Sequence, residues 1–467
     1  MSEVTQSPPT SVEGRQGNPL WSSRLAFILA ATGSAVGLGN IWKFPYITGE
    51  NGGGAFVLVY LLCIALIGLP ILIAEVMLGR RGRQSPINTM TTLATTDGRS
   101  RNWRLLGWSG VLAAYLILSF YSVIGGWSLA YVGNAASGTF AGANGDAIGA
   151  LFGGMLSSPE TLLMWHSVFM ALVIAIVARG LKSGMEKAIN VLMPLLFLLL
   201  LVMVGYAMST DGFGQAVQFL FTPDFSKLST EAVLTALGHA FFTLSLASGA
   251  MMAYGSFLPK QFSVVGTAAS IAVVDTAVAL LAGLAIFPLV FANGLEAGAG
   301  PGLIFQTLPL AFGQMDGGTL FGTLFFFLLL VAALTSAISM LEPTVEWLEE
   351  RKGISRLKGT LLAGLSVWAL GITTVLSFNL WSDVHPLAFL PVFEGKTFFD
   401  IFDYLTANVM LPLGGMFIVI YAGWCMKPEA LAHALELRHE VLFKGLRLTM
   451  RYIAPSLVLI VFLNQLL

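Results

Sequence analysis

The chain has 467 residues, of which 56% are hydrophobic and only 10% charged, and its mean hydropathy is +0.80. Soluble domains carry about 25% charged residues, so this composition excludes an ordinary soluble protein and predicts a polytopic membrane protein. The net charge of −1 gives no support to a nucleic-acid partner. Both cysteines lie in apolar runs and the five histidines show no ligand spacing, so neither a disulfide framework nor a metal motif is indicated.

Eleven segments are long and apolar enough to cross a bilayer, which takes about 20 residues. They are 22–48, 54–78, 106–133, 160–180, 187–208, 230–257, 262–293, 317–350, 357–378, 398–425 and 445–466. A further apolar element at 300–313 is too short to span, and we expect it to re-enter the membrane from one side. The predicted fold class is an all-α polytopic membrane protein with about 11 transmembrane helices.

The distribution of basic residues predicts the orientation of the chain. All but three of the 24 Lys and Arg residues lie near the N-terminus or in loops after even-numbered spans; the exceptions are Lys43, Lys227 and Lys396. The positive-inside rule therefore places the N-terminus in the cytoplasm and the C-terminus outside. Residues 1–18 are polar and lack the apolar core of a signal peptide, so we expect a disordered cytoplasmic tail.

The first span contains features that weaken a helix at mid-membrane. Gly33, Gly37 and Gly39 fall close together, polar Ser34 and Asn40 lie among them, and glycine costs about 1 kcal/mol relative to alanine inside a helix. A broken helix at this depth is tolerated where it lines a cavity, so the segment predicts a site for ions and small polar ligands. The alternative is a glycine-rich face that packs against another helix.

The sixth span is irregular too, because Thr243, Ser245, Ser248 and Gly249 lie at its middle. Paired interruptions five spans apart are typical of an inverted-repeat transporter with a binding site at the membrane midplane. We therefore expect a 5+5 inverted repeat with helices 1 and 6 broken. Its halves would be 19–208 and 230–425, followed by a cytoplasmic loop and helix 11 at 426–467.

Several polar side chains lie inside predicted spans, where they are costly and usually functional. Glu75 is in the second span, Asp275 in the seventh and the Thr335-Ser336 pair in the eighth. Hydroxyls, carbonyls and one carboxylate are hard oxygen ligands that suit sodium. The alternatives are that the two hydroxyls bond to their own helix and that Glu75 holds a broken backbone together. No catalytic motif is present, so we do not expect an enzyme.

Segments of the chain resemble, in order, motifs of the neurotransmitter:sodium symporter family, in its bacterial amino-acid branch. The matching segments are 33–45, 51–56, 242–246, 334–336 and 400–406. The resemblance extends from Trp21 to about Trp424, and several long motifs in the right order make it specific.

The resemblance implies two sodium sites and one substrate site. The first sodium site would use Ala35, Asn40, Thr243 and Asp275, and the second would use Gly33, Val36, Ala332, Thr335 and Ser336. The carboxylate of the substrate would lie between Tyr121, the amides of broken helix one and the first sodium ion. Residues implied to line the substrate site are Ala35, Gly37, Gly39, Ile117, Tyr121, Ile124, Phe242, Thr243, Ser245, Ser248, Ser336 and Met340.

The resemblance also implies two gates. Lys43 and Asp403 would form the outer pair with His239 nearby, Phe242 would be the lid, and Trp21 and Glu350 would belong to the inner gate. The chain departs from the family pattern in this region. Lysine replaces the usual arginine at Lys43, Asn18 occupies the position of the inner arginine, and Phe257 replaces an inner tyrosine.

The implied activity is sodium-coupled import of a neutral amino acid by alternating access, with two sodium ions and no chloride requirement. Asp275 would supply the negative charge that chloride supplies in animal relatives. It could also take a proton after sodium leaves, which would allow proton antiport. Alternatives are transport of another small zwitterion, such as an imino or amino-sulfonic acid, or a substrate sensor on the same scaffold. We expect a multi-pass inner (plasma) membrane protein with lipid around it and no obligate protein partner.

Overall fold

Nine uninterrupted helical segments among the described residues are long and apolar enough to cross a membrane. The computed structural model describes residues 20–297, 302–437 and 439–466. The nine segments comprise α3 (Gly54–Cys63) with α4 (Leu69–Gly82), α6 (Arg104–Ala136), α8 (Pro159–Val177), α9 (Lys187–Ala207), α13 (Val264–Ala292), α15 (Gly318–Lys352), α16 (Arg356–Ser377), α17 (Phe398–Tyr404) with α18 (Leu411–Ile420), and α20 (Glu440–Leu448) with α21 (Ala454–Leu466).

The two remaining predicted spans are broken. The first consists of α1 (Arg24–Ala35) and, after one helical turn at Gly39–Lys43, α2 (Phe44–Glu50), with a bend of 52° between the two parts. The sixth consists of α11 (Thr230–Thr243) and α12 (Ala250–Ser256). Between them the chain leaves the helix, with positive φ at Ser245 (51°), Ala247 (60°) and Gly249 (75°). The predicted fold class, with breaks in helices one and six, is confirmed.

Four short helices in the connections were not predicted: α5 (Pro86–Thr96), α7 (Gly145–Leu156), α10 (Phe213–Phe221) and α19 (Pro428–Leu435). The predicted short element at 300–313 begins outside the described residues and continues as a turn at Leu303–Thr307 and α14 (Leu308–Gln314). The predicted tail, 1–18, lies outside the described residues. The repeat boundaries at 19–208 and 230–425 stay a prediction.

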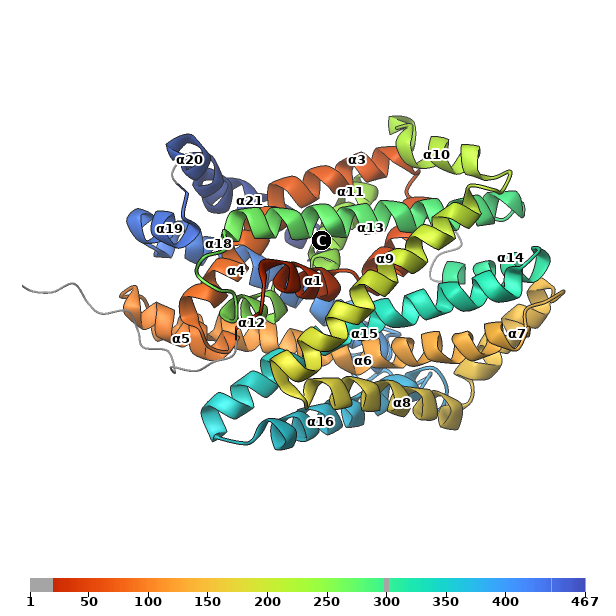
Figure 1. Ribbon diagram of the computed structural model, residues 1–467, viewed down its shortest axis with the longest axis horizontal. Helices are drawn as coiled ribbons and strands as arrows, with labels where there is room; N and C mark the ends of the chain where they lie inside the picture. The colour runs from red at the N-terminus through yellow and green to blue at the C-terminus, as the bar shows by residue number, and fades with distance from the viewer. Residues whose placement is uncertain (1–19, 298–301, 438, 467) are drawn as a thin grey trace, which may run out of the picture.

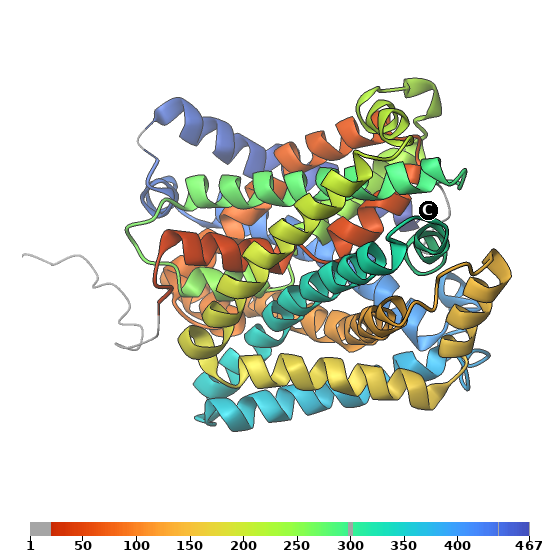
Figure 2. The ribbon, with the colours of Figure 1, turned by 45° about the vertical axis from the view of Figure 1, so that its right-hand side comes forward.

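The helices form two groups that meet at the breaks. α6 and α15 lie side by side, and α8 and α16 pack together against them along one side of the molecule, as both ribbon views show (Figures 1 and 2). On the other side of α15, α1 contacts α9, α12 and α13, and α12 packs against α4. Both broken helices are thus enclosed by protein, as backbone that leaves the helix inside a membrane requires.

Glycine lets α4 and α12 approach backbone to backbone. A Cβ atom placed on Gly79 of α4 would lie 2.0 Å from the carbonyl oxygen of Met252, and one on Gly255 of α12 would lie 2.6 Å from the carbonyl oxygen of Val76. Small residues at such crossings allow close packing of membrane helices without side chains between them. This contact fixes the position of α12, which is the second half of broken helix six.

We predict that Gly79→Ala destabilises the protein by about 1–3 kcal/mol, because the added methyl group meets backbone that cannot give way. The measurement is the melting temperature of the purified protein in detergent. Gly205→Ala on α9 is the control, since nothing lies within 4 Å of its Cβ position. Equal melting temperatures for the two variants would contradict the close contact.

Candidate functional site

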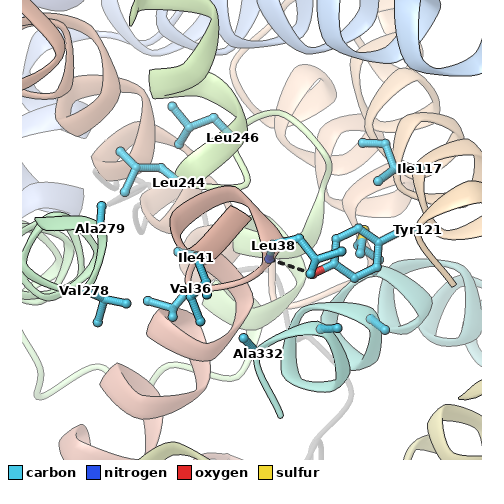
Figure 3. Packing of buried hydrophobic residues seen from close by; sticks show 14 of the residues in the cluster. Val36, Leu38, Ile41, Ile117, Tyr121, Leu244, Leu246, Val278, Ala279 and Ala332 are labelled. Carbon is cyan, nitrogen blue, oxygen red and sulfur yellow. Dashed lines mark hydrogen bonds between the residues drawn. The ribbon is translucent and has the colours of Figure 1, made fainter. Parts of the chain in front are cut away.

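The two breaks face each other and are tied together by hydrogen bonds. The Ser245 hydroxyl in the second break donates to the carbonyl oxygen of Ser34 at 2.8 Å. Figure 3 shows residues of both breaks, together with Ile117 and Tyr121 of α6 and Ala332 of α15, around one point in the molecule. The site is therefore built where the two broken helices meet α6, α13 and α15.

A carboxylate holds the second break. Glu75 of α4 is fully buried, and its Oε2 accepts a hydrogen bond from the amide of Ala247 at 2.9 Å. Ala247 is one of the residues with positive φ, so Glu75 satisfies an amide that the helix no longer uses. Of the two roles considered for Glu75, the geometry favours that of a support for the broken backbone.

The first cluster of oxygen atoms surrounds Asp275, whose side chain is fully buried. The Asn40 amide nitrogen donates to Asp275 Oδ1 at 2.8 Å and to Thr243 Oγ1 at 3.0 Å, and Thr243 Oγ1 donates to Asp275 Oδ2 at 3.0 Å. Asn40 Oδ1 accepts from the amide of Gly37 at 3.1 Å. To bind sodium here, the Asn40 amide has to turn over and present its oxygen. Ala35, the fourth predicted ligand, lines the adjacent cavity.

The second cluster joins α1 to α15. The Ser336 hydroxyl lies 3.3 Å from both the Gly33 and Val36 carbonyl oxygens, and the Thr335 hydroxyl donates to the Ala332 carbonyl at 3.1 Å. All five residues predicted for the second sodium site thus come together. Both hydrogen bonds of the Thr335 hydroxyl, to Ala332 and to Val331, lie within its own helix, as the alternative for hydroxyls in helices holds. Thr335 nevertheless lies next to α1, since a Cβ atom on Gly33 would be 3.3 Å from the Thr335 Cβ. Three carbonyls and two hydroxyls are a suitable oxygen set for sodium.

A small cavity of about 30 Å³ lies between the two clusters. The Tyr121 hydroxyl at its wall accepts a hydrogen bond from the amide of Leu38 at 3.2 Å (Figure 3). Gly37 is needed here because a Cβ atom would lie 2.4 Å from Ser336 Oγ and 2.8 Å from the Tyr121 oxygen. The lining residues are Ser34, Ala35, Gly37, Leu38, Gly39, Ile117, Tyr121, Phe242, Ser245, Ser248, Ser336, Met340 and Leu411.

This lining differs from the prediction at five residues: Ile124 and Thr243 were predicted but do not line the cavity, and Ser34, Leu38 and Leu411 line it but were not predicted. Ile124 lines a neighbouring cavity and Thr243 lies in the first oxygen cluster, so neither is in the wall of the small cavity. Leu411 of α18 was missed, because nothing in an apolar run marks a single leucine as cavity-lining. Ser34 was missed as a lining residue although its position inside the glycine run was a usable signal.

Lys43 and Asp403 line one wider cavity of about 330 Å³ on the far side of Phe242 from the small cavity. Within the described residues no ion pair joins them; the Lys43 ammonium instead lies 4.6 Å from the centre of the Phe242 ring. His239 is buried against Phe44 and Tyr60, with ring centres 5.9 and 5.4 Å away. We call this part of the molecule the Lys43 end.

The opposite part, which we call the Trp21 end, is tightly packed. Trp21 is only 2% exposed, and its indole N–H donates to the carbonyl of Tyr254 in α12 at 3.3 Å. Glu350 belongs to a separate network, in which it accepts hydrogen bonds from the Ser85 hydroxyl at 2.6 Å and from the Asn88 amide at 2.7 Å. Asn18, at the position of the inner arginine, lies outside the described residues.

Two broken helices around a cavity, with oxygen clusters beside it, define a secondary transporter of the inverted-repeat type. The comparisons with known proteins agree. Residues 18–145 and 154–467 match the model of the Sodium:neurotransmitter symporter family. The chain belongs to this family.

Similar proteins support the assignment over nearly the whole chain. The sodium-dependent transporter YhdH of Bacillus subtilis is 42% identical over 95% of this chain and 97% of its own. A sodium-dependent transporter of Haemophilus influenzae is 34% identical over 96% of this chain and 98% of its own. The crystal structure of MhsT in complex with L-phenylalanine superposes with a TM-score of 0.87 at 43% identity, covering 96% of this chain and 99% of MhsT.

We predict that Glu75→Leu lowers stability by about 1–3 kcal/mol, because the Ala247 amide loses its acceptor in a buried place. Glu75→Gln is the matched control, since its amide oxygen can still accept that hydrogen bond. The melting temperatures of both variants show whether the hydrogen bond to Ala247 is what stabilises the break. A loss of the same size in both would show that the carboxylate charge, rather than the hydrogen bond, supports the break.

Proposed function

We propose that this sodium-dependent symporter imports a neutral amino acid by alternating access, with two sodium ions. The observation that carries the proposal is the buried cluster of Asn40, Thr243 and Asp275 beside the small cavity. A buried carboxylate without a basic partner needs a cation, and the hydroxyl and amide groups around it supply the further oxygen ligands that sodium prefers.

The neutral amino acid is supported by the walls of the cavity. The Tyr121 hydroxyl and the amides of the first break can bind a carboxylate, since a half-helix N-terminus favours anions. Carbonyls of the second break can bind an amine, and Ile117, Met340 and Leu411 form an apolar remainder. The amino acid bound to the related MhsT is consistent with this substrate class.

Asp275 also supports chloride independence and proton antiport. Its fixed charge can offset that of sodium without a bound anion. After sodium leaves, the same carboxylate would be buried without a cation, and taking up a proton would remove the cost of that charge. We place the protein in the inner membrane. The Lys43 end faces outward and the Trp21 end faces the cytoplasm, as the distribution of basic residues predicts.

Uptake into liposomes tests this function. The purified protein is reconstituted, and radiolabelled amino, imino and amino-sulfonic acids are offered with inward gradients of sodium chloride, sodium gluconate or choline chloride. We expect sodium-dependent accumulation of a neutral amino acid that persists in gluconate. If no solute accumulates while sodium still raises the melting temperature, the result points to a different solute or to a sensor. If sodium has neither effect, the assigned sodium sites are wrong.

We predict that Asp275→Asn weakens sodium binding about 10- to 100-fold, because a charged ligand becomes a neutral one. The readout is the sodium concentration for half-maximal uptake, or for half-maximal stabilisation, measured in gluconate. The control is Asp383→Asn in an exposed loop, which should change nothing. Unchanged sodium affinity in Asp275→Asn without chloride would overturn the role of this carboxylate.

Ser248→Phe should shift uptake toward smaller substrates, because Ser248 is buried in the wall of the cavity and a ring would fill it. Competition of unlabelled amino acids against the labelled substrate measures the shift. Ser248→Ala, which removes the hydroxyl without adding bulk, should keep the size preference. An unaltered substrate profile in Ser248→Phe would show that Ser248 does not shape the site.

A further inference from the structure

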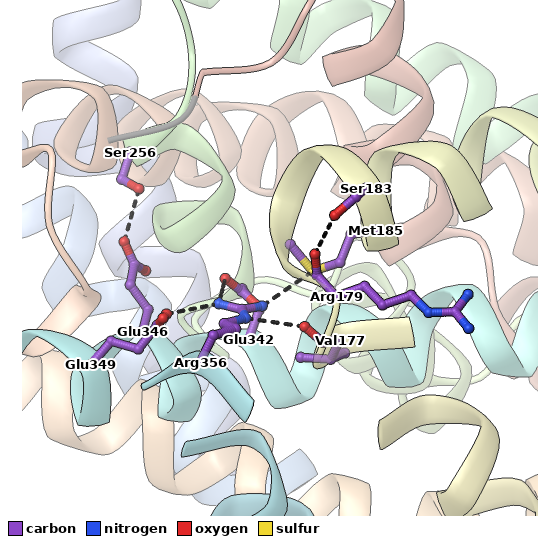
Figure 4. Close-up of polar contacts among 9 residues, drawn as sticks. All are labelled: Val177, Arg179, Ser183, Met185, Ser256, Glu342, Glu346, Glu349 and Arg356. Carbon is purple, nitrogen blue, oxygen red and sulfur yellow. Dashed lines mark hydrogen bonds and ion pairs between the residues drawn. The ribbon is translucent and has the colours of Figure 1, made fainter. Parts of the chain in front are cut away.

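Four carboxylates lie along α15 at the Trp21 end: Glu342, Glu346, Glu349 and Glu350 (the first three are drawn in Figure 4). Glu346 is four residues from Glu342 and Glu350 and three from Glu349. These spacings place side chains on the same side of a helix, where like charges repel. Each of them therefore needs its own donors or a counter-charge.

One arginine serves two of the four. Arg356, at the start of α16, forms ion pairs with Glu342 and, at 3.0 Å, with Glu349. Its remaining contacts include the carbonyl of Val177, to which Nε donates at 3.0 Å (Figure 4). The guanidinium is thus occupied on all sides by groups other than Glu346.

The Glu350 carboxylate accepts hydrogen bonds from the backbone amide of Ser85 at 3.0 Å and from the Ser85 hydroxyl and the Asn88 side-chain amide described above. Ser85 is the residue before α5, so the carboxylate lies at a helix N-terminus, which favours negative charge. Three of the four carboxylates therefore have partners that suit an ionised group.

Glu346 lacks such partners. Its side chain is 5% exposed, and Oε2 has no hydrogen-bond partner among the described residues. In the described part of the structure its one hydrogen bond joins Oε1 to the Ser256 hydroxyl of α12, at 3.1 Å. An ionised carboxylate buried in this way costs several kcal/mol.

The geometry of Ser256 shows where a hydrogen atom is needed. Its hydroxyl oxygen is 2.7 Å from the carbonyl oxygen of Ala253 as well as 3.1 Å from Glu346 Oε1. A hydroxyl has one hydrogen, and a carbonyl can only accept, so the shorter contact uses the hydrogen of Ser256. The contact with Glu346 can then be made by a hydrogen of the carboxyl group, which an ionised acid lacks. A protonated Glu346 provides it and donates to Ser256.

The charged groups around Glu346 add to this requirement. On α15 they are Glu342 and Glu350, both acidic, and on α16 Arg356, which is already paired. From α12 the facing group is Ser256, whose carbonyl accepts from Arg83 at 3.0 Å. Within the described part of the chain no three acidic, histidine or cysteine side chains converge to hold a metal ion. The ligand that fits is a proton.

We propose that Glu346 is a proton-binding site which fastens α15 to α12 while the Trp21 end is closed. The proton is held on the carboxyl group, which donates to Ser256, and Ser256 donates to Ala253. When water reaches Glu346 as this end opens, the proton leaves and the link between the helices is lost. This site is distinct from Asp275, and it does not depend on which solute is transported.

Infrared difference spectra of the purified wild type at about pH 6 and about pH 9, recorded in saturating sodium, test the site directly. We expect a carbonyl band of a protonated carboxylic acid that is absent from Glu346→Gln and retained in Glu349→Gln, the matched acid that has an ionic partner. Ser256→Ala should move the band to higher frequency, because the acid loses its acceptor. A band of equal intensity in wild type and Glu346→Gln would overturn the proposal.

Melting temperature against pH gives a second readout that needs no transport. A proton held only in the folded state stabilises it at low pH, and this stability is lost as the pH rises, by up to about tenfold in the folded-to-unfolded ratio per pH unit. Glu346→Gln, which mimics the protonated acid, should remove this part of the pH dependence and stay folded. Equal pH dependence in the two proteins would contradict the proposal, even if sodium-driven uptake were demonstrated.

Discussion

The arrangement of the whole protein depends on satisfying backbone groups where two helices break inside a membrane. No bulk water is available there, so every freed amide and carbonyl needs a partner from the protein. At the first break the Tyr121 hydroxyl and the Asn40 side chain accept from the Leu38 and Gly37 amides. At the second break Glu75 accepts from Ala247. Tyr121 belongs to α6 and Glu75 to α4, so these hydrogen bonds hold both helices beside the breaks.

The same hydrogen bonds bear on the two proposed sodium sites. In the first cluster the positive edge of the Asn40 amide faces the Asp275 carboxylate, and in the second the Ser336 hydroxyl faces two carbonyl oxygens. A sodium ion would take the place of these weak positive charges, and in the first cluster the Asn40 amide would also turn its oxygen toward the ion. Binding would exchange one set of polar contacts for another, with little movement of the backbone. A site of this kind can both fill and empty readily.

The sequence predicted the features that local composition determines. Glycine and hydroxyl residues inside apolar runs located both breaks. Polar residues inside the spans pointed to Asp275, Thr335 and Ser336, and the resemblance to the symporter family, not the spacing, grouped the ligands into two clusters. What it could not predict depends on packing between distant segments. Leu411 lines the cavity because α18 happens to lie there, and Lys43 lies over Phe242 and is not paired with Asp403. The sequence did not predict the special position of Glu346 either, because only the structure shows that Arg356 forms its ion pairs with Glu342 and Glu349.

The backbone contact between α4 and α12 has a consequence for motion. Carbonyl groups of each helix lie against glycines of the other, without flexible side chains to absorb a shift. Interfaces packed in this way have one arrangement and do not slide gradually. We therefore expect α12 to move together with α4 as one rigid unit. The residues between α11 and α12, which leave the helix, are where we expect such a unit to pivot.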